Sequence, residues 1–431
     1  MKGTILSRKK QNCKKNPYFY SLPIAIHDNK VQEYRMHFND VIALRRAFDS
    51  VKDRQKKNIL PDLNEKKIRL KKIREFSVGN EELLIQTISK LEKNGVRVFH
   101  VKGKDEAIQI VIKELGSEKL VVKSKSNVTK EIELTELLEL QGIQVVETDI
   151  GDRVLQLLRY KPSHPTGPIS HLSAKKIAKG LSDFYGTNIN EDPDGIVKFM
   201  RDEIRQYIDK ACVGISGANA ITAEEGAILI AHNEGNIFEV IRKKKHIIVT
   251  AVDKVYPDIE DAITMMKVLS FNATGSIVPS FIEIISGASK TADLEKKFFK
   301  GVHDPKDVVL ILVDNKRSDI IRKGFKEILY CIDCGNCLLY CPMYNTIGNS
   351  FASGKNLGGK GLALSFLSDE EIEKKLELCL TCGHCKEHCP LDIDVPSIIR
   401  RLRGNKVHEE IYYFLKSHLL WLYYIVRLKM Q

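Results

Sequence analysis

The chain has 431 residues, of which 43% are hydrophobic and 29% are charged, and its formal net charge is +12. This length exceeds one ordinary core, so we expect about two or three folded units, and the hydrophobic content excludes a disordered chain. The positive charge is local: residues 1–80 carry 20 Lys and Arg against 8 Asp and Glu, and the rest of the chain is balanced.

Residues 1–80 are predicted to be a basic helical segment with a solvated charged face. Basic segments also bind nucleic acids or anionic membranes. No zinc-finger, RNA-recognition or helix-turn-helix signature accompanies this one, so we expect no nucleic-acid partner.

The termini give no sign of export or of a membrane span. The N-terminus lacks an apolar stretch of about 7–15 residues, and no run approaches the ~18–20 apolar residues of a span. The nearest is "LLWLYYIV" near the C-terminus. We expect residues 406–431 to form an amphipathic helix that docks on a partner, with peripheral membrane association as the alternative. Ten cysteines without an export signal favour a reducing, cytoplasmic location, where thiols serve metals.

Helical periodicity comes first along the chain. "FNDVIALRRAFDSVKDRQKK" and "NEELLIQTISKLEKNG" have apolar residues every three to four positions. Asn80 is a suitable N-cap for the second helix, because Glu81 and Glu82 place acidic groups in its first turn.

Strand and helix signals then alternate over residues 81–318. The predicted strands are "VRVFHV", "KLVVKSKS", "IQVVETD", "HIIVTAV" and "VVLILVD". Predicted helices lie between them, including one capped helix over 127–142. This alternation predicts an α/β domain with a mainly parallel sheet covered by helices. From about residue 319 the chain changes to helix and loop around cysteines.

Two cysteine cassettes follow, each with the pattern C-x2-C-x2-C-x3-C-P. The first begins "CIDCGNCLLYCP" and the second "CLTCGHCKEHCP". This is the ligand pattern of bacterial-type [4Fe–4S] clusters, whose fourth cysteine binds the other cluster. We therefore expect two [4Fe–4S] clusters in residues 319–405, one on Cys331, Cys334, Cys337 and Cys389, and the other on Cys379, Cys382, Cys385 and Cys341.

Zinc is the alternative occupant of the cassettes. Zinc sites usually pair two separated C-x2-C units, so the uninterrupted four-cysteine runs favour iron–sulfur. The long insert between the cassettes resembles the α-helical ferredoxin modules of succinate dehydrogenase and heterodisulfide reductase subunits. Such a module carries electrons and has no substrate chemistry of its own.

A ligand pocket is predicted in the α/β part. Lys123 and Lys125 lie at a strand end, and Asn219 and Glu224 lie in the Gly- and Ala-rich stretch "GISGANAITAEEGAILIA". Ligands bind beyond the carboxyl ends of parallel strands, so these residues could hold a carboxylate or acyl ligand. The alternative is that Asn219 and Glu224 satisfy backbone groups in a tight crossover.

Catalytic residues cannot be assigned. The chain has no G-x-G-x-x-G, P-loop or H-E-x-x-H pattern. His164 and His171 lie in the loop "PSHPTGPISH", where a histidine is usually solvated or caps a turn. A non-catalytic role is therefore expected for both.

The motifs "VKSKSNVTKEIEL", "GIQVVETDIGD", "PSHPTGPISH", "ISGANAITAEEGAI", "VVLILVDNKRS" and "CIDCGNCLLYCPMYNTIG" occur in this order. Together they resemble the lactate-utilisation iron–sulfur proteins, in which a LUD domain precedes a ferredoxin module with two [4Fe–4S] clusters. The resemblance covers about residues 35–400. It implies a LUD domain similar to CoA-transferase and sugar-isomerase folds.

The resemblance also implies a function: an iron–sulfur electron-transfer subunit of a multi-subunit oxidoreductase that oxidises L-lactate or a related 2-hydroxy acid. Its expected partners are a cysteine-rich subunit resembling heterodisulfide reductase and a second LUD subunit. Two alternatives remain. The chain could be the electron carrier of a heterodisulfide-reductase-like complex, or a LUD-domain enzyme acting on a carboxylate or acyl substrate.

Overall fold

The computed structural model describes residues 36–367 and 373–404 of the chain. These residues belong to one compact unit. Most of the basic segment 1–80 is therefore described, whereas its first 35 residues and the expected C-terminal helix at 406–431 lie outside the described residues. No described helix is both long and apolar enough to cross a membrane.

Three helices open the described part: α1 (Phe38–Lys57), α2 (Leu63–Ser77) and α3 (Glu81–Lys93). The two helices expected from the periodicity, α1 and α3, are confirmed. The Asn80 side chain caps α3 by accepting a hydrogen bond from the Leu83 backbone N–H at 3.0 Å. Helix α1 buries an apolar stripe that includes Leu44 and Phe48.

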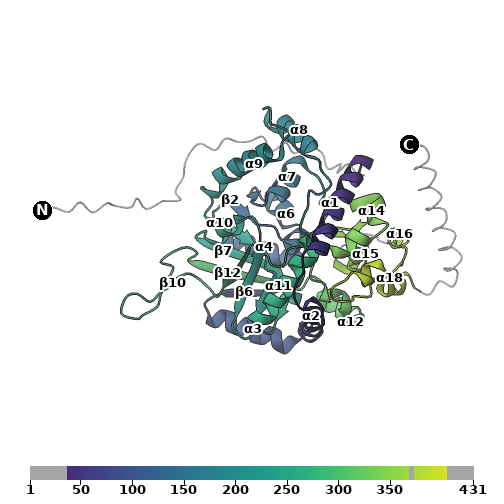
Figure 1. Ribbon diagram of the computed structural model, residues 1–431. Coiled ribbons are helices and arrows are strands. Elements are labelled where there is room, and N and C mark those ends of the chain that lie inside the picture. Colours follow the sequence, from purple (N-terminus) through teal and green to yellow (C-terminus); the bar gives the residue numbers. More distant parts are fainter. Residues whose placement is uncertain (1–35, 368–372, 405–431) are drawn as a thin grey trace, which may run out of the picture. The chain divides into compact units, whose positions relative to one another are not determined.

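A six-stranded sheet forms the centre of the α/β part (Figure 1). Its order is β1-β12-β7-β4-β2-β3, and every neighbouring pair is parallel. The strands are β1 (Arg97–Val101), β2 (Leu120–Lys123), β3 (Gln144–Glu147), β4 (Val213–Ser216), β7 (Lys245–Ala251) and β12 (Asp307–Val313). The predicted α/β class with a parallel sheet is confirmed.

Helices connect these strands: α4 (Lys104–Leu115), α5 (Asn127–Glu131), α6 (Leu134–Leu140), α7 (Ile150–Leu158), α8 (Ala174–Tyr185), α9 (Pro193–Ile208), α10 (Asn236–Ile241) and α11 (Ile259–Thr274). Helix α12 (Arg317–Arg322) follows the last strand, β12. The single helix expected over 127–142 is wrong. The chain leaves α5 at Ile132, and Glu133 adopts a left-handed conformation with φ +55° before α6 begins.

The strands alternate their buried side chains between two faces of the sheet, as parallel strands covered on both sides require. Val121 packs with side chains of α4 and α6 on one face. Its neighbour Val122 packs with α9 on the other face. That second face is also covered by α3 and by a smaller sheet.

The smaller sheet was not expected. Its order is β8-β5-β6-β9, with strands β5 (Ala220–Thr222), β6 (Ala227–His232), β8 (Val255–Tyr256) and β9 (Phe281–Ile285). A hairpin of β10 (Lys290–Thr291) and β11 (Phe299–Lys300) follows β9 and extends away from both sheets in Figure 1. The Gly- and Ala-rich stretch therefore leaves the large sheet after β4 and builds half of the small one.

The cassettes lie in short helices and turns after α12. These elements are η2 (Lys326–Tyr330), α13 (Asn336–Tyr340), α14 (Tyr344–Ile347), η3 (Gly348–Ser350), β13 (Ala352–Ser353), β14 (Asn356–Leu357), α15 (Gly358–Ala363), η4 (Ser365–Leu367), α16 (Glu373–Leu376), α17 (His384–Glu387) and α18 (Val395–Arg403). We call residues 326–403 the cassette segment.

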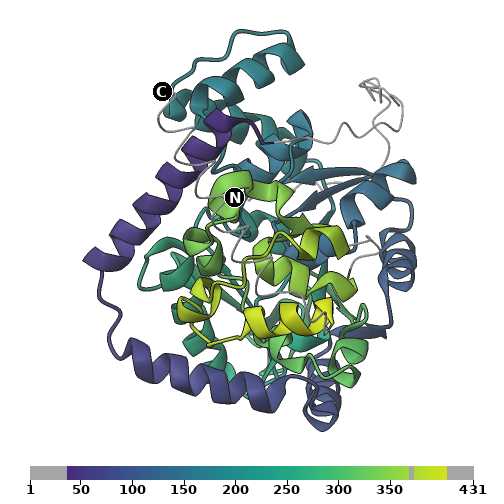
Figure 2. The ribbon, with the colours of Figure 1, turned by 90° about the vertical axis from the view of Figure 1, so that its right-hand side faces the viewer.

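One apolar core joins the cassette segment to α1, α2 and α11. It includes Phe48, Leu70, Met265, Tyr344 and Ile399. Figure 2 shows α1 and α2, in purple, bordering the cassette segment on two sides. The expected bounds at 80/81, 318/319 and 405/406 stay predictions.

Candidate iron–sulfur site

The two cassettes repeat one backbone conformation. Asp333 and Thr381, each two residues after the first cysteine of its cassette, both have positive φ. Gly335 and Gly383, each directly after the second cysteine, also have positive φ, at +74° and +91°. Both glycines cap the short helix that carries the third cysteine. This turn curls the first three cysteines of each cassette around one centre, because the left-handed residues reverse the chain twice.

The fourth cysteines change places between the cassettes. One cavity is lined by the first three cysteines of the first cassette together with Cys389 of the second. The neighbouring cavity is lined by the first three cysteines of the second cassette together with Cys341 of the first. Cys337 and Cys385 reach both cavities, so the two cavities lie side by side.

Burial dominates the acid–base chemistry of these thiols. It raises the pKa of Cys341 and Cys385 to about 12 and that of Cys389 to about 11. It also raises the pKa of Cys337 well above its usual value, and neighbouring cysteines add to the effect. Cys382 is the exposed member of the eight.

This donor set fits iron–sulfur clusters. Five cysteines line each of the two cavities, with Cys337 and Cys385 common to both, and soft thiolates are the ligands that iron–sulfur clusters take. Metal binding would release the protons that the raised pKa values hold on the thiols. The described cysteines of the cassettes form no disulfide with one another, so all eight sulfur atoms are available as ligands.

A charged network lies directly beside the first cassette. The Asp333 carboxylate accepts a hydrogen bond from the Lys360 ammonium on α15 and one at 3.2 Å from Lys254, which follows β7. Burial alone would raise the pKa of Asp333, but the two ammonium groups hold it well below its usual range. The Asp333 backbone N–H also points to the Cys331 sulfur at 3.4 Å. The network therefore joins the α/β part to the first cassette.

The two lysines of the predicted pocket are engaged with acids at the edge of the large sheet. Lys123 is fully buried, and its ammonium lies 2.8 Å from the Glu147 carboxylate on the adjacent strand. The Lys125 ammonium lies 2.6 Å from Asp149 and donates to the Thr166 carbonyl. Both side chains therefore sit in ion pairs within the domain.

Asn219 and Glu224 do not join these lysines. The Asn219 side-chain amide oxygen accepts a hydrogen bond from the Ala231 backbone N–H at 2.9 Å, which ties β6 to the segment between β4 and β5. Glu224 is exposed on the turn between β5 and β6. None of the four predicted pocket residues lines the two cysteine-lined cavities or a third cavity, which lies beside the first cassette.

The two loop histidines have structural partners. The His164 ring is buried, its Nδ1 accepts from the Thr166 and Gly167 backbone N–H groups, and it packs against Gly335 so closely that a Cβ there would collide with it. Burial lowers the pKa of His164 to about 4. His171 lies 2.9 Å from the Ser163 hydroxyl. His164 thus fixes the cassette turn against the α/β part.

Sequence reasoning missed the charged residues that meet at the first cassette. Lys254 and Arg317 follow β7 and β12, the two strands "HIIVTAV" and "VVLILVD", so their places at the carboxyl edge were available as a signal. Lys360 stands in the Gly-rich "GGKG" of the insert, and its contact with Asp333 depends on tertiary packing that no spacing rule gives.

The fold and the cassettes define an iron–sulfur protein with an α/β domain in front. Residues 84–313 match the LUD domain family, and residues 327–393 match the 4Fe-4S dicluster domain family. The chain belongs to the LUD domain family. The expected family and its iron–sulfur character are confirmed.

Several curated proteins are similar over much of the chain. Lactate utilization protein B of Oceanobacillus iheyensis is 34% identical over 302 residues, which are 69% of this chain and 61% of that protein. The uncharacterized electron transport protein YkgF of Escherichia coli K12 is 31% identical over 284 residues, 65% of this chain and 58% of that protein. Lactate utilization protein B of Bacillus pumilus is 31% identical over 299 residues, 68% of this chain and 61% of that protein. The chain thus matches about 60% of the length of these relatives.

One solved structure, a DUF162 family protein from Deinococcus radiodurans, is 15% identical and covers 54% of this chain and 97% of its own. Its TM-score of 0.30 is too low to bear on the fold.

Proposed function

We propose that the protein is an electron-transfer subunit of an oxidoreductase and that it carries two [4Fe–4S] clusters. The observation that carries this proposal is the exchange of the fourth cysteine between the cassettes, which gives two four-sulfur sets around adjacent cavities. Clusters of this type supply one-electron transfer. The proposed ligand sets are Cys331, Cys334, Cys337 and Cys389 for one cluster, and Cys379, Cys382, Cys385 and Cys341 for the other.

The position of the two sets suits passage of electrons through the chain. The first set lies against the α/β part, where Cys331 and Asp333 meet Lys254. The second set includes the exposed Cys382 and so reaches the protein surface. An electron donor on the side of the α/β part and an acceptor at the surface near Cys382 would therefore be linked by two adjacent centres.

The names of the relatives support a role in the oxidation of L-lactate or a related 2-hydroxy acid, since two of the three are called lactate utilization protein B and the third an electron transport protein. The proposed partners are a cysteine-rich subunit resembling heterodisulfide reductase and a second LUD subunit, with no nucleic acid. The proposed location is the cytoplasm.

A second candidate function is a LUD-domain enzyme that acts on a carboxylate or acyl substrate. A cavity of about 740 Å³ beside the first cassette, lined by several cationic side chains, favours this candidate. The two functions differ in where chemistry occurs: a subunit needs a partner to supply electrons, whereas an enzyme turns its substrate over alone.

An anaerobic reduction assay separates the two functions. The intact chain is purified without oxygen, its absorbance near 400 nm is followed, and L-lactate is added with and without a native lysate fraction that co-purifies with it. We expect bleaching only in the presence of the co-purifying subunits. Bleaching by L-lactate with the pure chain would support the enzyme, and failure of dithionite to bleach an iron-loaded chain would contradict the electron-transfer role.

A further inference from the structure

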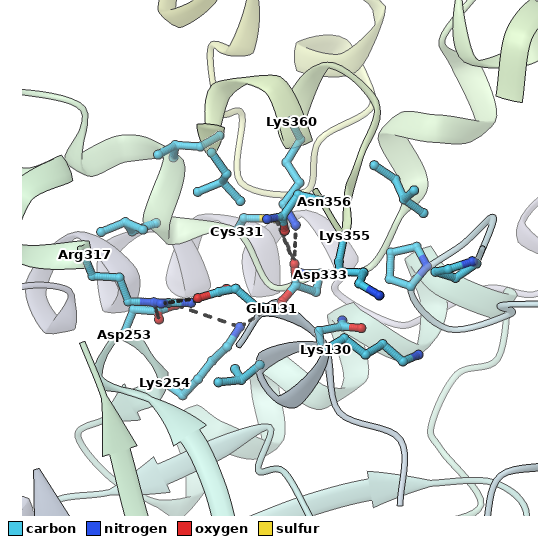
Figure 3. Close-up of a pocket in the computed structure, with 18 of the residues that line it drawn as sticks. Lys130, Glu131, Asp253, Lys254, Arg317, Cys331, Asp333, Lys355, Asn356 and Lys360 are labelled. Atoms are coloured by element: carbon cyan, nitrogen blue, oxygen red, sulfur yellow. Dashed lines mark hydrogen bonds and ion pairs between the residues drawn. The ribbon is translucent and has the colours of Figure 1, made fainter. Parts of the chain in front are cut away.

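A cavity opens between the carboxyl edge of the large sheet and the first cassette (Figure 3). The segments that follow β2, β7 and β12 form one side, and the cassette turn with the β13–β14 hairpin and α15 forms the other. The empty space between these walls is about 740 Å³, a figure that includes open solvent at the mouth. The cavity therefore occupies the place where parallel sheets bind ligands.

The charges that line the cavity are unequal. Five cations face it, Lys130, Lys254, Arg317, Lys355 and Lys360, against three carboxylates, Glu131, Asp253 and Asp333. Arg317 is held by Glu131 and Asp253, so its charge is compensated. The ammonium groups of Lys254 and Lys360 share the carboxylate of Asp333, and Lys254 also lies 3.9 Å from Asp253.

The remaining two cations, Lys130 and Lys355, form ion pairs with acids that do not line the cavity. Lys130 lies 2.7 Å from Asp152, and Lys355 lies 2.8 Å from Glu136. Lys355 is the most exposed of the five cations, with 37% of its side chain accessible. Figure 3 shows Lys130 and Lys355 on the same side of the cavity, opposite Arg317. The lining thus carries more cations than carboxylates, and two of the cations lie together on this side.

We propose that this cavity binds a small carboxylate anion, of the size of a 2-hydroxy or 2-oxo acid, next to the first cassette. Lysine ammonium groups are point charges that bind carboxylate and phosphate alike. The choice of a carboxylate rests on the proposed function, and phosphate is the rival with the same chemistry. Asn127 and Asn356 also line the cavity and offer amide groups to the hydroxyl or carbonyl oxygen of such an acid.

The bound anion would lie near Cys331, which lines the same cavity. Its negative charge would compete for Lys360 and Lys254, which otherwise neutralise Asp333 beside the Cys331 sulfur. Binding should therefore change the electrostatic field most strongly at the first ligand set, to which Cys331 belongs, and less strongly at the second set, whose cavity is lined by Lys360 but not by Cys331 or Lys254. This gives a spectroscopic signature that a purely structural role of the lysines would not produce.

The test uses the full iron-loaded chain under anaerobic conditions. Isothermal titration is carried out with L-lactate, with pyruvate and with inorganic phosphate, and the paramagnetic resonance spectrum of the reduced protein is recorded with and without each. We expect one carboxylate to bind per chain and to shift one of the two cluster signals. The variant Lys355→Glu should weaken binding at least tenfold, and Asn127→Asp should weaken it less.

Lys71→Glu is the matched control. Like Lys355, Lys71 forms an ion pair between the cassette segment and the rest of the chain: its ammonium lies 3.2 Å from Asp392. Its side chain is 38% accessible, and it does not line the cavity. Binding by this variant should equal that of the wild type. If both variants lost affinity for the carboxylate equally, the loss would come from the general surface charge, and the proposal would be overturned.

Three further outcomes are decisive. Binding of phosphate but of neither carboxylate would overturn the choice of ligand. Absence of binding in a chain with full iron content would overturn the cavity as a site while the proposed electron-transfer function stands. If the chain purified under anaerobic conditions contained no iron, the proposed electron-transfer function would be contradicted. The same titration on that chain would still decide whether the cavity binds a carboxylate.

Discussion

The carboxyl edge of the large sheet and the cassette segment both bury polar groups, but they compensate them in different ways. At the sheet edge, Lys123 and Glu147 stand opposite each other on paired parallel strands and form a buried ion pair. In the cassettes, thiols converge on other thiols, and burial raises their pKa. Lys123 and Glu147 neutralise each other within the chain. The thiols are instead kept protonated by burial, and a bound metal centre would stabilise their deprotonated form.

The comparison separates two kinds of charged residue near the boundary between the α/β part and the cassette segment. A charged residue that meets its partner on a neighbouring strand stabilises the sheet and offers little to a ligand. Charged residues at this boundary, such as Lys254 and Lys360, share one acidic partner, Asp333. They also line the cavity proposed above as a ligand site. The two kinds of site should therefore respond differently to metal removal, to substitution and to pH.

The largest effect is expected from removal of iron. Because metal binding contributes directly to the folding of small metal-bound segments, anaerobic chelation should expose the backbone of residues 331–341 and 379–389 to hydrogen exchange. Strands β7 and β12 contribute buried apolar side chains to the cores on both faces of the sheet and should keep their protection. Mass spectrometry of exchanged peptides measures both regions in one sample. Equal loss of protection in the strands and in the cassettes would contradict the separation of the two regions.

A smaller effect is expected when the buried ion pair is broken. Lys123→Met leaves the Glu147 carboxylate buried without its ammonium partner, which typically costs about 3–5 kcal/mol. Adding Glu147→Leu should recover a large part of this loss, because the pair is then replaced by apolar groups. Urea denaturation followed by circular dichroism gives the change, and the iron content should stay at the wild-type value. A single variant within about 1 kcal/mol of the wild type would be inconsistent with a buried, tightly paired lysine.

The smallest effect concerns pH and His246 on β7, which is fully buried against the Ser216 hydroxyl at 2.7 Å. Burial lowers the pKa of His246 to about 3. Below about pH 6.5 the unfolded chain binds a proton that the folded chain does not, so stability is lost as the pH falls, by about 1.4 kcal/mol per unit. Between pH 6.5 and 5.0 this amounts to about 2 kcal/mol, and at pH 7 and above the contribution is fully present.

The variant His246→Gln should remove this part of the pH dependence. The matched control is His100→Gln on β1, since His100 is exposed. Urea midpoints at pH 7.0 and 5.0 give the difference, with iron measured at both values so that cluster loss is not mistaken for it. A control variant that flattens the pH dependence as much as His246→Gln would refute the assignment.

The sequence predicted five of the six strands of the large sheet, because parallel strands buried on both faces are runs of Val, Ile and Leu such as "VVLILV". Strand β4 was not predicted, since its four residues, VGIS, run into the Gly- and Ala-rich stretch. It did not predict the small sheet, since strands as short as β8 and β5 carry no periodicity of their own. The break in the helix over 127–142 escaped notice because a left-handed Glu133 has no sequence signal comparable to glycine.

The site was predictable only in part. The cysteine spacing predicted two sulfur sets with exchanged fourth ligands, and the described cavities have that lining. The lysines at the end of β2 were placed at the correct edge, but the register that sets Lys123 against Glu147 was not considered. The charged cavity depends on contacts between residues far apart in sequence, such as Lys254 with Asp333 and Lys355 with Glu136, which only the folded chain brings together.

The exchange of the fourth cysteines is tested most directly by paramagnetic resonance on serine variants of the reduced, anaerobically purified protein. The wild type should contain about eight iron and eight sulfide per chain and show two coupled signals. Cys341→Ser should damage the same signal as Cys379→Ser, and Cys389→Ser should damage the same signal as Cys331→Ser. If Cys341→Ser and Cys331→Ser abolish the same signal, the cassettes do not exchange their fourth ligands and the proposed arrangement is wrong.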